Sequence, residues 1–430
     1  MQTRFTAEQL RDPDVAESEQ ILRKCVHCGF CTATCPTYVL LGDELDSPRG
    51  RIYLVKDMLE SGRPASAAVA RHVDRCLSCL ACMTTCPSGV HYQHLIDHAR
   101  AHVERTFRRP PAERLLRAML AAVLPSTARF RALVRIAAPL KPFARMLPAR
   151  LAAMVELAPR RLPRPAMPLA DGARFAARGA RRARVALLAG CVQPALAPHI
   201  NEASVRLLTR AGAEVVVIGG CCGAIVHHMG RDEAGRTLAA ALLRRTRREE
   251  ARGGFDAVVA NASGCGTHLK DYGFLLRNDA SSAEAADLAR RARDVTEVLA
   301  ELGLPEPADP PRWTIAYHSA CSMQHGQRLH ALPRGLLEQA GFTVREVPEG
   351  HLCCGSAGTY NVLQPQLARA LRERKARNIG ALDVRAVATG NLGCITQLAP
   401  ALGVPIVHTV ELLDWATGGP RPASLGPGAE

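Results

Sequence analysis

The chain has 430 residues, of which 47% are hydrophobic, so it is long and apolar enough to form two or three packed domains. It contains no apolar run near the length of about 20 residues that a membrane-spanning helix requires. Its aromatic content of 4% is too low to favour a surface that stacks nucleic-acid bases. We therefore expect a soluble or peripheral protein of several domains, and no nucleic-acid partner.

The first 86 residues contain the cysteine spacing C-x2-C-x2-C-x3-C-P twice. The two runs are Cys25, Cys28, Cys31 and Cys35, followed by Pro36, and Cys76, Cys79, Cys82 and Cys86, followed by Pro87. This spacing is the signature of bacterial ferredoxins, in which the fourth cysteine of each run ordinarily binds the other [4Fe–4S] cluster. The spacing therefore predicts two clusters, one on Cys25, Cys28, Cys31 and Cys86, and one on Cys76, Cys79, Cys82 and Cys35.

Structural zinc is the main alternative for these eight cysteines. Zinc ribbons use two C-x2-C pairs separated by a dozen or more residues, whereas each run here places three cysteines within seven residues. Disulfides are also disfavoured, because the N-terminal sequence lacks the apolar stretch of a signal peptide and cytoplasmic thiols stay reduced. The doubled run favours iron–sulfur clusters and electron transfer.

Forty residues separate Cys35 from Cys76, which predicts a helical type of ferredoxin domain with helices inserted between the two runs. Ser47 and Pro48 are typical of the cap and first turn of a helix, which continues through the amphipathic residues 52–60. Arg49 and Arg51 could form docking contacts or tune a cluster potential through their charge. If they lie on the helix surface, they would do neither.

The positive charge of the chain is concentrated in a basic segment, residues 107–184. It contains 17 Arg and one Lys against three acidic residues, and the rest of the chain is neutral overall. Its composition predicts short amphipathic helices broken by Pro125, Pro139, Pro142 and Pro148. Such a segment could lie on an anionic membrane surface, dock an acidic partner, or serve only as a solvated linker.

The eight remaining cysteines form a second duplication. The first copy is Cys191, Cys221, Cys222 and Cys265, and the second copy is Cys321, Cys353, Cys354 and Cys394. Corresponding cysteines are 129 to 132 residues apart, which indicates an internal repeat of a domain-sized unit. Short apolar segments precede the cysteines in both copies, so we expect two small parallel sheets with cysteines at the carboxyl ends of their strands.

Four cysteines at strand ends could bind an iron–sulfur cluster, bind zinc, act as redox-active thiols, or fill a core. Because the whole set is repeated, we favour a cluster or metal in at least one copy over core filling.

These motifs give the chain its resemblance to a known family. The residues from Cys25 to Tyr38, from Gly42 to Ile52 and from Cys86 to Val90 are similar to the iron–sulfur subunits of bacterial glycolate oxidase (glycolate dehydrogenase). The chain also resembles the wider group that combines a two-cluster ferredoxin domain with two cysteine-rich CCG domains. That group includes small subunits of anaerobic glycerol-3-phosphate dehydrogenase, lactate-utilisation proteins and heterodisulfide reductase subunits.

One departure from the heterodisulfide reductase pattern bears on the chemistry. There the last cysteine of a CCG domain belongs to a C-x-x-C pair, whereas here the corresponding positions are His268 and Gln397. The missing thiols argue against thiol–disulfide chemistry. His268 could act as a ligand, but we expect it on a helix surface; His27, His227 and His228 are expected to bond to sulfur or face solvent.

The resemblance implies an α+β multidomain fold and the following domains: a ferredoxin-type domain over residues 15–105, a basic helical linker over 106–183, and CCG domains over 184–304 and 312–418. It implies an electron-transfer subunit whose FAD-containing partner oxidises glycolate to glyoxylate, with quinone as the final acceptor. No flavin, nicotinamide or phosphate-loop motif is present, so the substrate site is expected on the partner. We expect the protein in the cytoplasm, peripherally on the inner face of the membrane.

The alternatives are the equivalent subunit of a lactate or glycerol-3-phosphate dehydrogenase, a heterodisulfide-reductase-like enzyme, and a metal-stabilised nucleic-acid protein that uses the basic segment. The nucleic-acid hypothesis predicts that the protein binds DNA with an affinity that falls steeply as the salt concentration rises.

Overall fold

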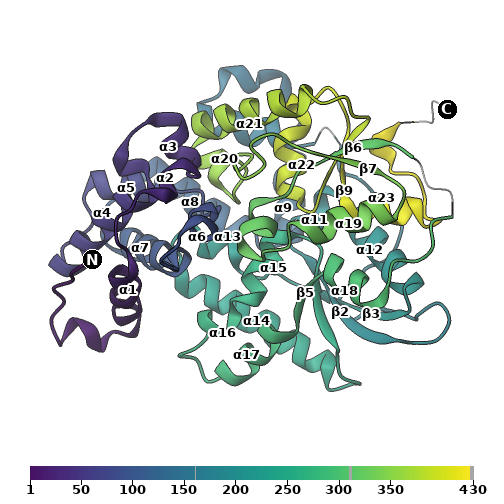
Figure 1. The fold of residues 1–430 in the computed structure, drawn as a ribbon, viewed down its shortest axis with the longest axis horizontal. Coiled ribbons are helices and arrows are strands. Elements are labelled where there is room, and N and C mark those ends of the chain that lie inside the picture. The colour runs from purple at the N-terminus through teal and green to yellow at the C-terminus, as the bar shows by residue number, and fades with distance from the viewer. Residues whose placement is uncertain (160, 309–311, 427–430) are drawn as a thin grey trace.

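The computed structural model describes residues 1–159, 161–308 and 312–426, and its N-terminal region consists of helices (Figure 1). The helices are η1 (Gln9–Arg11), α1 (Pro13–Lys24), α2 (Phe30–Ala33), α3 (Pro36–Leu41), η2 (Glu44–Asp46), α4 (Pro48–Ser61), α5 (Ala67–Asp74), α6 (Ala81–Thr85) and α7 (Tyr92–Thr106). Helix α4 begins as predicted, because the Ser47 hydroxyl accepts a hydrogen bond from the Gly50 N–H at 3.0 Å and Pro48 occupies the first turn. The fully buried side chains of Leu22, Val73 and Ile96 lie in the core of this region.

The basic segment forms the short helices that its prolines predict. They are α8 (Pro111–Val123), α9 (Thr127–Ala137), the 3₁₀ helix η3 (Ala138–Met146) and α10 (Ala149–Leu157). Leu120 of α8 packs against Met229, Val362 and Leu363, so these helices lie against both of the repeated units that follow.

The first repeated unit contains a five-stranded sheet in the order β1-β3-β2-β4-β5. Its strands are β1 (Arg174–Phe175), β2 (Ala183–Gly190), β3 (Ala213–Gly219), β4 (Ala257–Ala260) and β5 (Ala292–Asp294). All pairs are parallel except β1 with β3. Strand β1 was not predicted, since it lies in the segment expected to be helical.

The second unit repeats the parallel part of this sheet in the order β7-β6-β8-β9. Its strands are β6 (Thr314–Tyr317), β7 (Thr343–Glu346), β8 (Ala386–Thr389) and β9 (Ile406–His408), and all pairs are parallel. The register repeats too: Val185 pairs with Val215 and Ala257, and Ile315 pairs with Val344 and Ala386.

Helices connect the strands in both units. In the first unit they are α11 (Gln193–Leu196), α12 (Pro198–Arg210), α13 (Ala224–His227), α14 (Asp232–Glu250), α15 (Ser263–Lys270), α16 (Tyr272–Leu275), α17 (Ser282–Arg291) and α18 (Val295–Leu302). In the second they are the π-helical turn η4 (Ser322–Gly326), α19 (Ala331–Gln339), α20 (Tyr360–Leu363), α21 (Pro365–Gly380), α22 (Leu392–Leu398), η5 (Ala399–Ala401), α23 (Thr409–Ala416) and η6 (Ala423–Leu425).

The two units share one hydrophobic core, which includes Leu187 and Leu207 of the first unit and Ile315 and Leu412 of the second. Arg206 of α12 also pairs with Asp414 of α23 at 2.6 Å. An N-terminal helical ferredoxin-like region followed by two α/β repeats confirms the predicted fold class (Figure 1).

Candidate iron–sulfur sites

The predicted ligands fall into four sets. Set A is Cys25, Cys28, Cys31 and Cys86; set B is Cys35, Cys76, Cys79 and Cys82; set C is Cys191, Cys221, Cys222 and Cys265; set D is Cys321, Cys353, Cys354 and Cys394.

The cysteines of set A line one pocket in the N-terminal region, with Arg49 and Pro87 beside them. Gly29 has a φ of 88°, a left-handed conformation that glycine adopts without strain, and it turns the chain between Cys28 and Cys31. Cys28 is exposed, and three exposed apolar side chains lie in the same region: Val26, Phe30 and Tyr53, which are 67%, 63% and 62% exposed. Set A therefore lies at a surface with unusual apolar exposure.

Set B lies deeper. Its four cysteines are all buried. Burial, together with the negative charge that Cys79, Cys76 and Cys35 would carry, raises the pKa of Cys82 well above its usual value. Four such thiols are costly to ionise together, and iron cations bound between them would remove that cost. The donors of set B thus fit a cluster, which supplies one-electron redox chemistry when bound.

Arg51 is the residue near set B whose role the sequence left open, and of the alternatives the helix-surface position is excluded for it. Its side chain is 1% exposed, and its Nη1 lies 3.8 Å from the Cys35 sulfur. Its guanidinium also donates to the Thr37 hydroxyl at 2.9 Å and to the His72 carbonyl at 2.7 Å. Burial opposes the charge of Arg51, but the neighbouring Cys76 and Cys35 thiolates and Asp46 outweigh it, so its pKa is raised.

Sets C and D have the same internal arrangement. In set C, the Cys191 and Cys222 thiols lower the pKa of Cys221, and the Cys221 and Cys265 thiols raise the pKa of Cys222, so the four side chains are neighbours. In set D, Cys321 lies 3.8 Å from Cys353, and Cys354 lies 3.4 Å from Cys394. Each set is formed as predicted at the carboxyl ends of parallel strands, since Cys191 follows β2, and Cys321 follows β6.

The surroundings of the two sets differ. His318 lies with Cys354 and Cys394 in a group whose ligand atoms are within 4.8 Å of one another. Burial lowers the pKa of His318 to about 3, so this imidazole is neutral. Lys375 is also buried near set D; burial lowers its pKa, while the thiolates of Cys354 and Cys353 act in the opposite direction. His318 stands three residues before Cys321. The corresponding residue of the first unit, three residues before Cys191, is Leu188, which has no ligand atom.

Sets C and D open into one shared cavity of about 330 Å³, which all eight of their cysteines line. Apolar side chains of the basic segment close one side of it; they include Leu120, Phe130, Leu133, Val134, Met154 and Leu157. The polar side chains of Gln193, Asn261, Asn391 and His228 also face it. The cavity is thus a mostly apolar chamber with a few polar groups, next to two sets of thiols.

Set B adjoins set D directly. Cys79 belongs to a small apolar cluster with Leu77, Tyr360 and Cys353, against which Cys321 packs. Burial raises the pKa of Cys79, and the neighbouring Cys321 raises it further. A hydrogen bond of 2.8 Å between Thr84 Oγ1 of α6 and His325 Nδ1 of η4 holds the same two regions together.

The histidines differ from expectation in two cases: His268, and His227, which is buried beside Asp97 and Asp232 instead of bonding to sulfur or facing solvent. His268 is only 3% exposed, so its predicted place on a helix surface is wrong. Its Nε2 lies beside Gly223, the residue that precedes α13. The His27 Nε2 is buried without a hydrogen-bond partner, and its ring lies edge-on to Tyr53. His227 and His228 lie beside Asp97.

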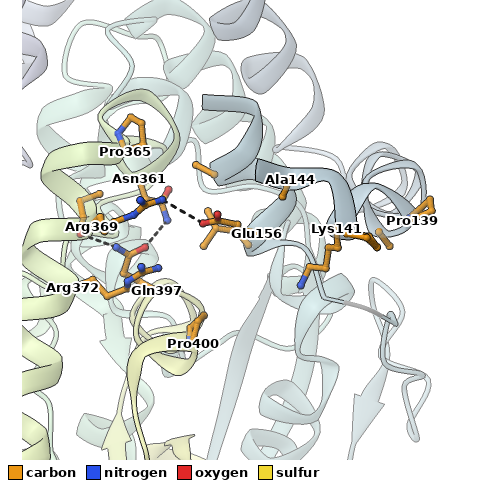
Figure 2. A pocket seen from close by; sticks show the side chains of 15 residues that line it. Pro139, Lys141, Ala144, Glu156, Asn361, Pro365, Arg369, Arg372, Gln397 and Pro400 are labelled. Carbon is orange, nitrogen blue, oxygen red and sulfur yellow. Dashed lines mark hydrogen bonds and ion pairs between the residues drawn. The ribbon is translucent and has the colours of Figure 1, made fainter. Parts of the chain in front are cut away.

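A separate, more open pocket of about 710 Å³ lies between η3 and α10 on one side and α20–α22 on the other (Figure 2). Glu156 points across it toward Arg369, at 3.8 Å, and Asn361 donates to Gln397 at 3.2 Å. None of the predicted ligands is among its lining residues, so it does not belong to the redox sites. Within the described part of the chain, no helix is both long and apolar enough to cross a membrane.

Family models and relatives agree with this division of the chain. Residues 21–90 match a model described as a 4Fe-4S dicluster domain, and residues 185–270 and 315–399 match one described as a cysteine-rich domain. The glycolate oxidase iron–sulfur subunit of Escherichia coli K12 is 41% identical over 97% of this chain and 99% of its own. The probable glycolate oxidase iron–sulfur subunit of Bacillus subtilis is 29% identical over 92% and 94%. Lactate utilization protein A of Oceanobacillus iheyensis is 23% identical over 54% of this chain and 96% of its own.

Proposed function

The chain belongs to the family of glycolate oxidase iron–sulfur subunits, and we propose that it transfers electrons within a respiratory 2-hydroxyacid dehydrogenase complex. An FAD-containing partner oxidises glycolate to glyoxylate and releases two electrons and two protons. This chain conducts the electrons toward a quinone. The E. coli glycolate oxidase subunit is 41% identical over nearly the full length, which favours glycolate as the substrate of the complex. The lactate-utilisation relative aligns with only 54% of the chain.

Sets A and B hold the two [4Fe–4S] clusters in this proposal. Cys86, from the second cysteine run, binds the cluster of set A, and Cys35, from the first run, binds the cluster of set B. The exposed Cys28 and its apolar neighbours Val26, Phe30 and Tyr53 make set A the entry point, because a docking partner would bury this surface. In this proposal the ferredoxin-type domain spans residues 15–105 and the basic linker spans 106–183. The two CCG domains span 184–304 and 312–418.

The observation that carries the proposal is the packing of Cys79 in set B against Cys321 and Cys353 in set D. It continues the line of thiols from the exposed set A, through set B, to the shared cavity. Because electron transfer needs closely spaced centres, this contact favours a metal or cluster in set D that extends the path. The buried Lys375 supports this, since a cation stabilises an anionic cluster.

The shared cavity is the proposed site of the quinone acceptor. Its apolar wall suits a quinone ring, and Asn391 and His228 could donate hydrogen bonds to the quinone oxygens. Helices α9 and η3 of the basic segment also carry exposed apolar side chains: Ile136, Phe143 and Met146 are 67%, 58% and 83% exposed. With the surrounding positive charge, these side chains favour peripheral binding to the anionic inner surface of the cytoplasmic membrane.

The test is anaerobic co-expression with the flavoprotein subunits, followed by glycolate addition and EPR of the iron–sulfur signals. We expect glycolate to reduce the clusters, and lactate or glycerol 3-phosphate to reduce them far more slowly. Iron and zinc analysis of Cys354→Ala and Cys222→Ala would show whether set D or set C holds a metal. Clusters that stay oxidised with glycolate but become reduced with lactate would contradict the glycolate assignment.

A further inference from the structure

A group of three side chains outside the cysteine sets lies where the helical region meets the first repeated unit. Asp97 comes from α7, and His227 and His228 come from the end of α13; their ligand atoms are all within 4.8 Å of one another. The side chains of Asp97, His227 and His228 are 8%, 9% and 33% exposed. Gly230, at a φ of 83°, brings the loop after α13 against the backbone of α7, which a side chain there would prevent.

The atoms that face one another in this group have no hydrogen-bond partner. Asp97 Oδ1, His227 Nδ1 and His228 Nδ1 are buried and unpaired, and His268 Nε2 on α15 is unpaired beside them. The His227 and His228 nitrogens lie 3.9 and 3.8 Å from the Asp97 oxygens, too far for hydrogen bonds. They are close to the separation of about 3.4 Å between ligand atoms around a tetrahedral zinc ion with bonds of about 2.0–2.1 Å.

The partner of the remaining His227 nitrogen is typical of a metal ligand. His227 Nε2 lies 3.3 Å from the Asp232 carboxylate. A carboxylate in this position fixes the tautomer of a histidine so that its other nitrogen is free to bind a metal. The neighbouring cysteine sets offer only thiols, whereas imidazole and carboxylate donors suit zinc and similar divalent ions.

We propose that Asp97, His227 and His228 form a divalent metal site of the zinc type, separate from the iron–sulfur sites, with its fourth position open to water beside His268. The ion ties α7 to the first repeated unit. Arg100, one turn after Asp97, donates to the Ser78 hydroxyl at 2.5 Å and to the Cys76 carbonyl. The metal therefore supports the helix that holds the loop of set B.

The test uses the full-length chain with its clusters, stripped of loose metal by a chelator and titrated anaerobically with Zn²⁺. We expect one tightly bound zinc per chain, and an affinity at least about 100-fold lower for Asp97→Asn and for His228→Gln. His98→Gln is the matched control: it lies next to Asp97 on the same helix and bonds to Ser18 at 2.7 Å, so zinc binding should be unchanged. Iron content should stay constant in all variants.

X-ray absorption at the zinc edge examines the wild-type ligands without relying on a variant. Nitrogen and oxygen neighbours at about 2.0–2.1 Å, without sulfur at about 2.3 Å, would support the site. Sulfur neighbours without nitrogen and oxygen neighbours, an unchanged zinc content in both Asp97→Asn and His228→Gln, or no stoichiometric zinc in the wild-type chain would each overturn it. The last result would leave the three side chains as a network of ion pairs.

Discussion

The guanidinium of Arg51 approaches the sulfur of Cys35 to 3.8 Å in a region where both side chains are buried. A fixed positive charge beside a cluster stabilises the reduced, more negative state, so Arg51 should set the reduction potential of the cluster at set B.

Arg51→Met should lower that potential by on the order of 100–200 mV, since a unit charge at about 4 Å contributes up to about 4 kcal/mol at an effective dielectric constant near 20. It should also destabilise the fold by about 3–5 kcal/mol, because Asp46 then loses a buried partner. Arg51→Lys keeps the positive charge and should therefore lower the potential less than Arg51→Met does. An EPR redox titration measures the shift, and Arg63→Met is the control, since Arg63 pairs with Asp57 on the exposed surface. An unchanged potential in Arg51→Met would exclude the charge effect.

Cys28→Ala and Cys79→Ala should each remove one cluster, which lowers the iron content by about four atoms per chain. Ser88→Ala, in the same pocket as Cys28, should not change it. Both variants should also interrupt glycolate-dependent transfer toward set D, because Cys28 belongs to the proposed entry point and Cys79 packs against Cys321 and Cys353. Iron analysis and EPR on anaerobic preparations measure both effects. Full iron content in either variant would refute the ligand assignment.

The basic segment should control membrane binding. The exposed arginines in it that have no ion-pair partner among the described residues include Arg114, Arg129, Arg135, Arg161 and Arg164. Substitution of all five by Glu should abolish co-sedimentation with anionic vesicles at low salt, because each positive charge near the surface contributes about 1 kcal/mol of binding free energy. The iron content should stay unchanged. A second variant, Phe143→Ser with Met146→Ser, should weaken binding at any salt concentration. Equal recovery of all proteins with the vesicles would favour the solvated-linker interpretation.

Ala137 lines the shared cavity, whereas Ala132 lies exposed on the same helix. Ala137→Phe should slow the glycolate-dependent reduction of a soluble quinone analogue at least about tenfold, because the added ring fills space that the acceptor needs. It should not slow reduction of a dye that accepts electrons at set A. Ala132→Phe should leave both rates unchanged. If Ala137→Phe slows both reactions equally, the substitution acts on the fold and the cavity is not the acceptor site.

Glu411 should make the stability of the second unit depend on pH. Burial and the nearby Asp414 raise its pKa to about 7, while Arg206 acts in the opposite direction and His199 lies 3.6 Å away. The folded chain therefore binds this proton more tightly than the unfolded chain. The stabilisation that the protonated Glu411 gives the folded chain is fully present below about pH 4 and is lost as the pH rises through 7.

Glu411→Gln should remove this dependence, and the stability difference between the two proteins should change by up to about 3 kcal/mol between pH 4 and 8. Urea unfolding followed by the fluorescence of Trp313 and Trp415, which pack together at 5.3 Å, reports on this unit. Glu338→Gln on the surface is the control. Parallel pH profiles for wild type and Glu411→Gln would rule out the effect.

Local patterns predicted much of this structure. The Ser47–Pro48 cap, the prolines of the basic segment and the repeated apolar segments before Cys191 and Cys321 act over a few residues, so the sequence displays them directly. The burial of Arg51 and His268 depends on which helices pack over them. The sequence also gave no sign that Cys79 meets Cys321, because that contact joins segments more than 240 residues apart through tertiary packing.

The same contact has a consequence for biogenesis. In the folded chain Cys79 is only 8% exposed, and Tyr360 and Leu371 of the second unit belong to the cluster that covers it. These covering residues are translated last, so set B stands open to oxygen until the second unit folds and docks. Cluster loading before that step would leave an oxygen-labile intermediate. Protection of the buried cluster is therefore a property of the completed chain, and truncations that leave the ferredoxin motifs intact should still produce an air-sensitive protein.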